Sequence, residues 1–202
     1  MHPNSAFRHA DRALLEALVD EVAFGMIFAA TPDGPRVAHV PLLWSTDSTV
    51  QFHLARGNAL TRHLDGATVL AVVNGPDGYI SPRWYSDGGA DQVPTWNYAA
   101  VELEGRVRRL DEEGLLAQIT ALSDKHEARV SAGLPWSIDK LSEARRIGLV
   151  KAIVGFELDV LGWRETLKLS QNKSAEDRAG LAAGLESEGA QAIALMMRNL
   201  TE

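Results

Sequence analysis

Six short strand-like segments follow one another between residues 24 and 110, and they leave few alternatives for the fold. Apolar or alternating residues occupy 24–31, 36–44, 49–55, 67–73, 79–85 and 93–110. Turn signals separate them, the strongest being Pro32-Asp33-Gly34-Pro35, and 45–48 is predicted as another turn. Strands at such short intervals are typical of a meander, so the sequence predicts antiparallel sheet rather than β-α-β units. Gly105, inside the longest segment, is a candidate bend or bulge.

Helical periodicity surrounds these segments. Apolar residues recur at helical spacing over 11–22, where Asp11 is the expected cap, and over 111–129 and 138–150. Two more strands, 153–160 and 165–170, are predicted on either side of a turn at Gly162. Ser174 and Asp177 form a capping-box pattern that opens a last helix. The sequence therefore predicts a single domain over residues 1–202, with a helical insertion at about 111–150 and a C-terminal helix at about 174–198.

Composition limits the function classes. The 202 residues include no cysteine, which excludes disulfides, thiolate catalysis and Cys-ligated zinc. The formal net charge of -7 argues against a protein whose main task is to neutralise DNA phosphates. The sequence shows neither a signal peptide nor a membrane-spanning run, so we expect a cytoplasmic location without membrane contact.

The common catalytic motifs are absent from the sequence. It contains no G-x-S-x-G, G-x-G-x-x-G or Walker A pattern, and His126-Glu127 lacks the second His of a zinc-protease motif. His39 and His53 alternate with apolar neighbours on predicted strands, so we interpret each as a core or pocket-wall residue rather than a metal ligand. The sequence thus identifies no catalytic residue and no metal site.

An aromatic cluster at residues 76–98 is the first candidate binding feature. It holds two of the five Trp and all three Tyr of the chain. Polar side chains lie beside these rings, namely Ser81, Thr95 and Asn97. A flat apolar surface with polar groups at its edge is the usual composition of a small-molecule pocket. The alternative is that the rings only fill the core of a barrel.

Two polar clusters complete this inventory. Residues 56–64 are predicted to pass from a strand end into a short helix, where free backbone N–H groups, Arg56 and Asn58 suit an anion. The second cluster, by itself typical of a solvated connection, consists of Lys168, Ser170, Gln171 and Asn172. Together with Thr95, Trp96 and Asn97, these clusters offer phosphate-binding groups, an aromatic surface and a cation beside amides. Flavin mononucleotide (FMN) needs such an inventory.

Five segments also carry a family resemblance: His53 to Asn58, Gly75 to Pro82, Val93 to Tyr98, Ala152 to Glu157 and Lys168 to Asn172. In this order and with similar spacing they resemble the PaiB-type family, called FMN-binding negative transcriptional regulators. The resemblance runs from about Phe7 to Leu185. The sequence departs from the family pattern after Tyr85, where Ser86-Asp87-Gly88-Gly89 replaces a loop that commonly contains a Lys.

The resemblance implies a six-stranded antiparallel split β-barrel of the FMN-binding, pyridoxamine-phosphate-oxidase-like class, mainly β with peripheral helices. It also implies a homodimer with FMN at the subunit interface. Arg56 and Asn58 would lie near the phosphate, and the strand at 95–97 and the segment 168–172 would lie near the flavin. The predicted cofactor-binding residues are therefore His53, Arg56, Asn58, Ser81, Thr95, Trp96, Asn97, Lys168, Ser170, Gln171 and Asn172.

Three function classes stay open. The resemblance favours a negative transcriptional regulator, and a flavin-dependent sensor without turnover needs the pocket but no catalytic group. The alternative is a flavin-dependent oxidoreductase acting on a small molecule, which the pocket inventory favours although no residue is evident as acid, base or nucleophile. Direct DNA contact has little support from charge, since the local basic groups at 106–109 and 145–146 are usually a solvated face.

Overall fold

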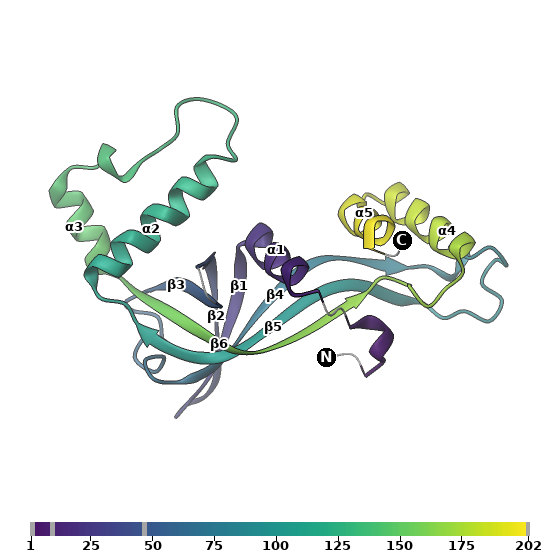
Figure 1. Cartoon of the computed structure of the whole chain (residues 1–202), viewed down its shortest axis with the longest axis horizontal. Coiled ribbons are helices and arrows are strands. Elements are labelled where there is room, and N and C mark those ends of the chain that lie inside the picture. Colours follow the sequence, from purple (N-terminus) through teal and green to yellow (C-terminus); the bar gives the residue numbers. More distant parts are fainter. Residues whose placement is uncertain (1–2, 9–10, 46–47, 201–202) are drawn as a thin grey trace. The chain divides into compact units, whose positions relative to one another are not determined.

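The structure is a computed structural model that describes residues 3–8, 11–45 and 48–200. Among these residues six antiparallel strands close a barrel in the order β1-β2-β3-β6-β5-β4 (Figure 1). The strands are β1 (Phe24–Thr31), β2 (Gly34–Trp44), β3 (Thr49–Ala55), β4 (Thr68–Ile80), β5 (Thr95–Arg109) and β6 (Ile153–Lys168). The predicted fold class is confirmed.

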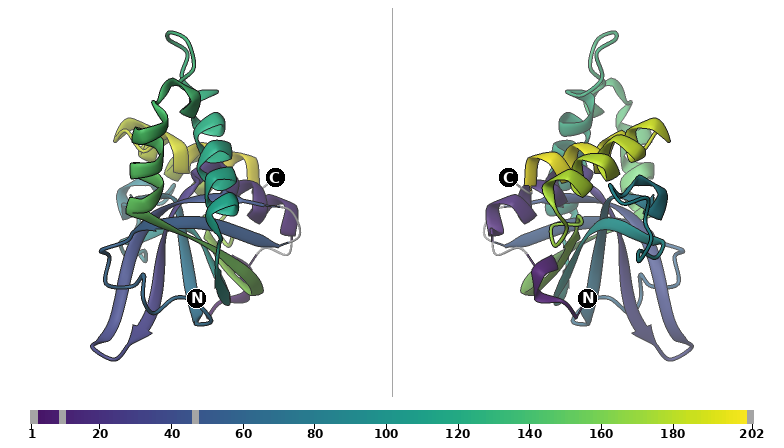
Figure 2. Two further views of the ribbon diagram at one scale, coloured as in Figure 1. Left: turned by 90° about the vertical axis from the view of Figure 1, so that its left-hand side faces the viewer. Right: turned by 90° about the vertical axis from the view of Figure 1, so that its right-hand side faces the viewer.

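Helices flank the strands, and side-chain caps begin several of them. The α-helices are α1 (Arg12–Val22), α2 (Glu112–Glu127), α3 (Glu143–Ala152), α4 (Ala175–Ser187) and α5 (Gln191–Leu200), and the short 3-10 helices are η1 (Ser5–Phe7), η2 (Pro82–Trp84) and η3 (Ile138–Lys140). The Asp11 carboxylate accepts hydrogen bonds from the first turn of α1, and Asp111 does the same for α2. The predicted cap of the last helix is confirmed, because Ser174 Oγ lies 3.1 Å from the Asp177 N atom. Helices α2 and α3 lie side by side (Figure 2).

Contacts divide the chain into two compact units. The first unit consists of Met1–Leu15, Asn74–Val101 and Arg164–Glu202, and it includes α4 and α5. The second unit, Glu16–Val73 with Glu102–Trp163, includes β1, β2, β3, α2 and α3. The boundaries fall inside α1, β4, β5 and β6. The single domain with a helical insertion stays a prediction.

Strand alternation builds the core of the second unit. Side chains at every second position of β3 are buried, namely Val50, Phe52 and Leu54. The Phe52 ring stacks on Phe156 of β6, with 5.6 Å between ring centroids. Gly105 permits close approach of two strands, because a Cβ there would lie 2.0 Å from the Asp159 carbonyl oxygen. The candidate bend is therefore a point of tight strand packing.

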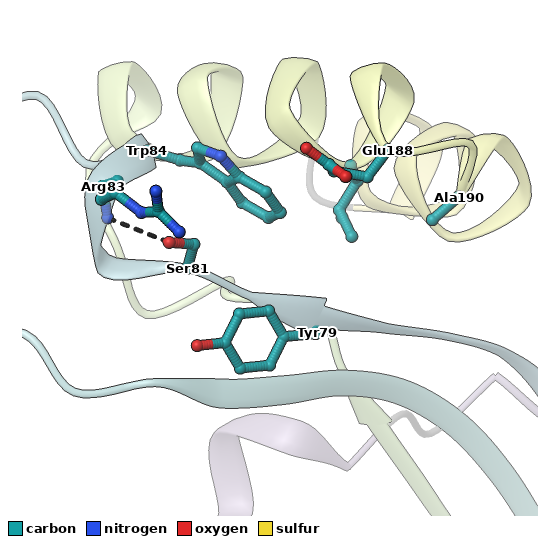
Figure 3. A pocket seen from close by; sticks show the side chains of 7 residues that line it. Tyr79, Ser81, Arg83, Trp84, Glu188 and Ala190 are labelled. Carbon is teal, nitrogen blue, oxygen red and sulfur yellow. Dashed lines mark hydrogen bonds between the residues drawn. The ribbon is translucent and has the colours of Figure 1, made fainter.

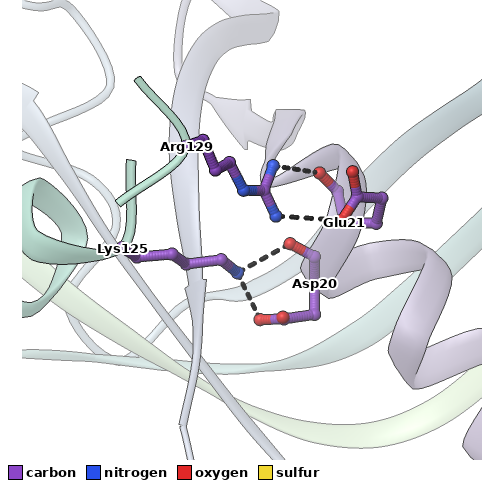
Figure 4. Close-up of polar contacts among 4 residues, drawn as sticks. All are labelled: Asp20, Glu21, Lys125 and Arg129. Carbon is purple, nitrogen blue, oxygen red and sulfur yellow. Dashed lines mark hydrogen bonds and ion pairs between the residues drawn. The ribbon is translucent and has the colours of Figure 1, made fainter. Parts of the chain in front are cut away.

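Ion pairs tie α2 to the end of α1 within the same unit (Figure 4). Lys125 donates to the backbone carbonyl and the carboxylate of Asp20. Arg129 donates to the backbone and side chain of Glu21, each at 3.0 Å. The first helix of the insertion is thus held at two successive acidic residues.

Two predicted strand breaks are wrong. The sequence signal Asn74-Gly75-Pro76 does not end β4, which continues to Ile80. Pairing of β4 with β1 covers only Leu70–Val72, so Pro76 lies beyond it and its missing N–H costs no bond to β1. Likewise Gly162 keeps extended backbone without a positive φ, and β6 runs unbroken through the predicted turn.

Helix boundaries also differ from prediction. The segment 56–64 forms successive turns instead of a short helix, because Asn58 Oδ1 accepts the Leu60 N–H and the turn bonds span only three residues. The helix terminus predicted to help bind an anion is therefore absent from this segment. Helix α3 begins at Glu143 instead of residue 138, and a positive φ of 85° at Gly189 separates α4 from α5. The turn predicted at 45–48 lies partly outside the described residues.

Candidate functional site

A cavity of about 450 Å³ lies in the first unit, beside the aromatic cluster (Figure 3). Its lining comes from the end of β4, from η2 and from the end of α4 with the residues after it: Tyr79, Ser81, Arg83, Trp84, Leu185, Glu188 and Ala190. Four residues of the 76–98 cluster thus line this cavity, among them the predicted Ser81, whereas Thr95, Trp96 and Asn97 are not part of its lining. The cavity offers aromatic surface together with a guanidinium and a carboxylate.

Glycines of α4 set the position of Trp84. A Cβ at Gly184 would lie 2.3 Å from Cδ2 of the indole, and one at Gly180 would lie 2.5 Å from the Trp84 carbonyl oxygen. Only hydrogen at these two positions lets the helix pack directly on Trp84. On the other side of η2, the buried Ser81 accepts a hydrogen bond from the Arg83 N–H at 3.3 Å. The aromatic wall and the serine edge of the cavity are therefore fixed by packing.

A second aromatic surface is formed by Tyr79 and Trp96. Their rings meet edge to face with 6.1 Å between centroids, and Trp96 is 55% exposed. Thr95, Trp96 and Asn97 all lie in β5, so their side chains alternate between the two faces of the strand. One planar ring cannot contact all three side chains on the same face. Trp96 is the exposed member, and Asn97 is fully buried.

The opposite face of β5 holds a polar pair and a lysine. Asn97 exchanges hydrogen bonds with Ser170, and its amide also contacts the Met197 sulfur of α5 at 3.3 Å. Lys168 donates to the Thr95 hydroxyl, and burial lowers the pKa of its ammonium from the usual lysine value. An electron-rich ligand edge beside Lys168 would favour the charged form again. The structure thus brings Lys168 and Thr95, two of the predicted site residues, together.

The residues that follow β6 brace the backbone. Gln171 accepts from the Leu169 N–H at 2.7 Å and donates to the carbonyl oxygens of Leu167 and Ala6. Asn172 is exposed. The Gln171 amide therefore stabilises the backbone that follows β6. The side chains of Asn97 and Ser170 are likewise bonded to each other. Direct contact of these residues with a flavin stays a prediction.

The loop that departs from the family pattern is tied to α4. Asp177 accepts from the backbone N–H and the hydroxyl of Ser86, and these bonds lower the pKa of its carboxyl. Lys173 donates to Gln92 at 2.8 Å, and its ammonium lies 5.2 Å from the centre of the Tyr85 ring. Burial raises the pKa of Tyr85. Sequence reasoning missed Lys173 as a cation beside this loop, although it follows directly on the segment 168–172.

The residues predicted to hold a phosphate lie in the second unit. Arg56 donates through Nε to the Lys151 carbonyl at 2.7 Å and through Nη2 to the Ile153 carbonyl at 3.1 Å. It lines a cavity of about 430 Å³ with two further cations, Arg109 and Lys151, and with the carboxylates of Asp111 and Glu112. The chain thus gathers three cations from three separate segments. Arg109 and Lys151 had no sequence signal beyond their charge.

His53 lies in the wall of another cavity of the second unit, consistent with its interpretation as a pocket-wall residue. Its Nδ1 lies 3.2 Å from Oε1 of Gln118, and burial lowers the pKa of the imidazole. The described residues contain no cluster of three or more His, Asp or Glu side chains suited to a metal ion. Within the described ranges, no helix is long and apolar enough to cross a membrane.

The six antiparallel strands form the closed barrel expected of the split-barrel class, and the first unit carries a cavity with an aromatic wall. Residues 1–161 match the family described as "Putative FMN-binding domain". The chain belongs to this family. FMN, the cofactor predicted from the sequence, is the flavin that the family's description names, so that prediction is confirmed.

Named relatives agree with this assignment. The chain is 32% identical over 174 residues to the Bacillus subtilis protein named protease synthase and sporulation protein PAI 2, covering 84% of this chain and 82% of that protein. This relative bears out the PaiB-type resemblance.

Solved structures support the fold. The FAD and heme binding protein from Mycobacterium smegmatis has a TM-score of 0.61 at 17% identity, over 87% of this chain and 79% of that one. The flavocytochrome Anf3 from Azotobacter vinelandii has a TM-score of 0.62 at 15% identity, over 89% of this chain and 78% of that one.

Proposed function

We propose that the protein is a flavin-dependent sensor of the negative transcriptional regulator type, with FMN as its cofactor. The observation that carries this proposal is the cavity of about 450 Å³, whose aromatic wall and few polar groups have the size and composition of a cofactor site. When bound, FMN supplies electron or hydride transfer. The name of the Bacillus subtilis relative, protease synthase and sporulation protein PAI 2, refers to sporulation, and this supports a regulatory role.

The proposal gives the predicted residues of the second unit a role at the phosphate and those of the first unit a role at the flavin ring. Arg56 and Asn58 hold the phosphate, since the Arg56 guanidinium is exposed and lines a cavity with Arg109 and Lys151. Trp96 offers an exposed ring for stacking, and Lys168 with Thr95 offers hydrogen bonds to a polar flavin edge. The remaining predicted residues support these groups: His53, Ser81, Asn97, Ser170, Gln171 and Asn172.

We further propose a homodimer. Trp96 and Tyr79 are 55% and 44% exposed, a large aromatic surface for an isolated chain to leave in water. A second subunit placed by two-fold symmetry would cover these rings and give two equivalent flavin sites. Sedimentation over a dilution series tests this. A stable monomer that binds FMN at full affinity contradicts it.

A sensor of this type can regulate transcription without binding DNA directly. Arg108, one of the basic residues considered for DNA, is ion-paired with Glu157 and lies 4.0 Å from Asp159. Its charge is therefore engaged within the protein. One observation favours the oxidoreductase alternative: Arg83 and Glu188 present opposite charges in the same cavity, which suits a polar substrate beside a flavin. The cytoplasmic location stays a prediction.

The experiment that separates sensor from enzyme uses FMN-loaded protein. Flavin absorbance is followed after addition of NADH or NADPH, with candidate small-molecule acceptors present for turnover. Binding to promoter DNA is measured in parallel over a salt series. The sensor proposal predicts at most one reduction per bound flavin without multiple turnovers. Sustained turnover of a small molecule would contradict the sensor proposal and support the oxidoreductase alternative.

A further inference from the structure

A smaller cavity in the second unit lies outside the residues proposed for the phosphate and the ring, apart from His53. Its volume is about 200 Å³, and it lies between β3, α2 and the segment that leads into α3. Seven of its lining residues are apolar, including Leu122, Trp136 and Leu149, while the polar ones are His53, Ser123 and Arg146. The cavity is therefore an apolar pocket, partly open to solvent at Trp136 and Leu149, with few polar groups.

Arg146 is the unusual member of this lining. It is half-buried, and among the described residues its guanidinium has neither a hydrogen-bond partner nor an ion-pair partner. A cation in apolar surroundings is costly unless an anion compensates it. The neighbouring Arg145 is exposed and does not line the cavity. Within the described part of the chain, Arg146 is thus the one Lys, Arg, Asp or Glu side chain of the lining, and no protein anion pairs with it.

The other polar residues do not supply that compensation. The Ser123 hydroxyl donates to the Ile119 carbonyl at 2.7 Å, so its proton is already engaged. His53 is held by the buried Gln118, and its lowered pKa keeps the imidazole neutral at pH 7. Charge selectivity in this cavity therefore rests on Arg146, with His53 as a neutral hydrogen-bonding partner.

Cavity size and lining define the ligand. An apolar cavity of about 150 Å³ accepts a benzene ring, so about 200 Å³ accommodates one ring with a small polar substituent. We propose that this cavity binds a small monocarboxylate with an aromatic or branched apolar body, its carboxylate on Arg146 and its body against Trp136 and Leu122. The bidentate geometry of guanidinium with carboxylate favours this pairing over a simple point charge.

Ion pairs hold the helix that forms one wall of this cavity. Lys125 of α2 binds Asp20 of α1, and Arg129, two residues after α2, binds Glu21 (Figure 4), so the helix that carries Leu122 is held at its C-terminal end. Arg146 and Leu149 come from α3. A ligand between them would join the two helices of the insertion to strand β3, so binding should raise the melting temperature of the protein.

The test compares benzoate with benzamide, which has the same shape but no charge. Calorimetry on the full-length protein, with and without saturating FMN, should show benzoate binding at least about tenfold more tightly than benzamide. Arg146→Met should remove this preference, Arg146→Lys should restore part of it, and the matched control Arg145→Met should leave it intact. Circular dichroism melts establish that each variant is folded.

Several results would overturn the proposal. Equal affinity for the two probes, or equal loss in Arg145→Met and Arg146→Met, removes Arg146 as the recognition group. An absence of saturable benzoate binding at millimolar concentration removes the site. Displacement of FMN by benzoate would show that the cavity belongs to the flavin site. Because benzoate is measured with and without FMN, failure of the flavin proposal leaves this one testable.

Discussion

Asn97 and Ser170 exchange two hydrogen bonds across the first unit. The Asn97 amide donates to Ser170 Oγ at 2.9 Å, and Oγ donates back to Asn97 Oδ1 at 3.2 Å. Asn97 is fully buried and Ser170 is 5% exposed, so water cannot replace either bond. The pair joins β5 to the chain just beyond β6, next to the Thr95 and Lys168 contact. The pair therefore positions the strand end that carries the proposed flavin contacts.

Replacing Ser170 with Ala should destabilise the protein by about 1 to 3 kcal/mol, because the buried Asn97 side chain loses both bonds to Ser170 and keeps only its contact with the Met197 sulfur. The exposed Ser131 provides the control, since Ser131→Ala should change the free energy of unfolding by less than about 0.5 kcal/mol. Urea unfolding measures both. Equal effects of the two substitutions would show that the buried pair contributes nothing specific.

Gly184→Ala should displace Trp84 from the wall of the 450 Å³ cavity, because the new Cβ would lie 2.3 Å from the indole. Overpacking of this kind costs about 1 to 3 kcal/mol. Gly148→Ala is the matched control: a Cβ at this position of α3 meets nothing within 4 Å, so helix propensity should stabilise that variant by about 0.5 to 1 kcal/mol. Thermal melts that move in the same direction for both variants contradict the packing assigned to Trp84.

Arg56→Ala should weaken FMN binding roughly tenfold to over a hundredfold, through loss of a charge-assisted bond to the phosphate. Riboflavin, which lacks the phosphate, should bind this variant and the wild type alike. Arg62→Ala is the control, since Arg62 is exposed and contacts only the neighbouring His63, at 3.0 Å, and Asp33, at 3.9 Å, among the described residues. A similar loss for FMN and riboflavin would assign Arg56 to folding, through its bonds to the carbonyls of Lys151 and Ile153.

Stability should fall as the pH is lowered below about 6.5, with His53 as one contributor. Burial lowers the pKa of His53 in the folded state, so below its unfolded value of 6.5 the unfolded chain binds the proton preferentially. The free energy of unfolding therefore decreases as pH falls from 6.5 through the folded pKa. His53→Gln should show a shallower decrease between pH 7.5 and 5.5 in urea titrations. A steeper decrease in the variant, or an NMR pKa of His53 above 6.5, contradicts the assignment.

Local signals predicted part of the fold well. The limits of β1 and β3 match prediction to the residue because turn residues and alternating apolar residues agree there. The lengths of β4 and β6 were predicted wrongly. Pro76 and Gly162 indicate breaks locally, whereas the barrel keeps both strands extended. Tertiary pairing outweighs local preference at these positions.

The site was predictable only in its composition. The aromatic cluster was visible because its residues are close in sequence. Helix α4 was predicted as an element, but the packing of its glycines on Trp84 was not. Asn97 and Ser170 were identified as polar candidates, but their mutual burial depends on a contact between residues 73 positions apart. The cation group of Arg56, Arg109 and Lys151 needs three distant segments to meet, which no local pattern indicates.

Titration of the purified protein with FMN tests the central claim most directly. The account predicts saturable binding at micromolar FMN, with a bound-flavin absorbance band and quenched flavin fluorescence, because Trp96 is exposed and able to stack on the ring. Trp96→Leu should restore much of the fluorescence of the bound flavin. A flat titration up to tens of micromolar FMN, with the flavin fluorescence unchanged, would contradict the account.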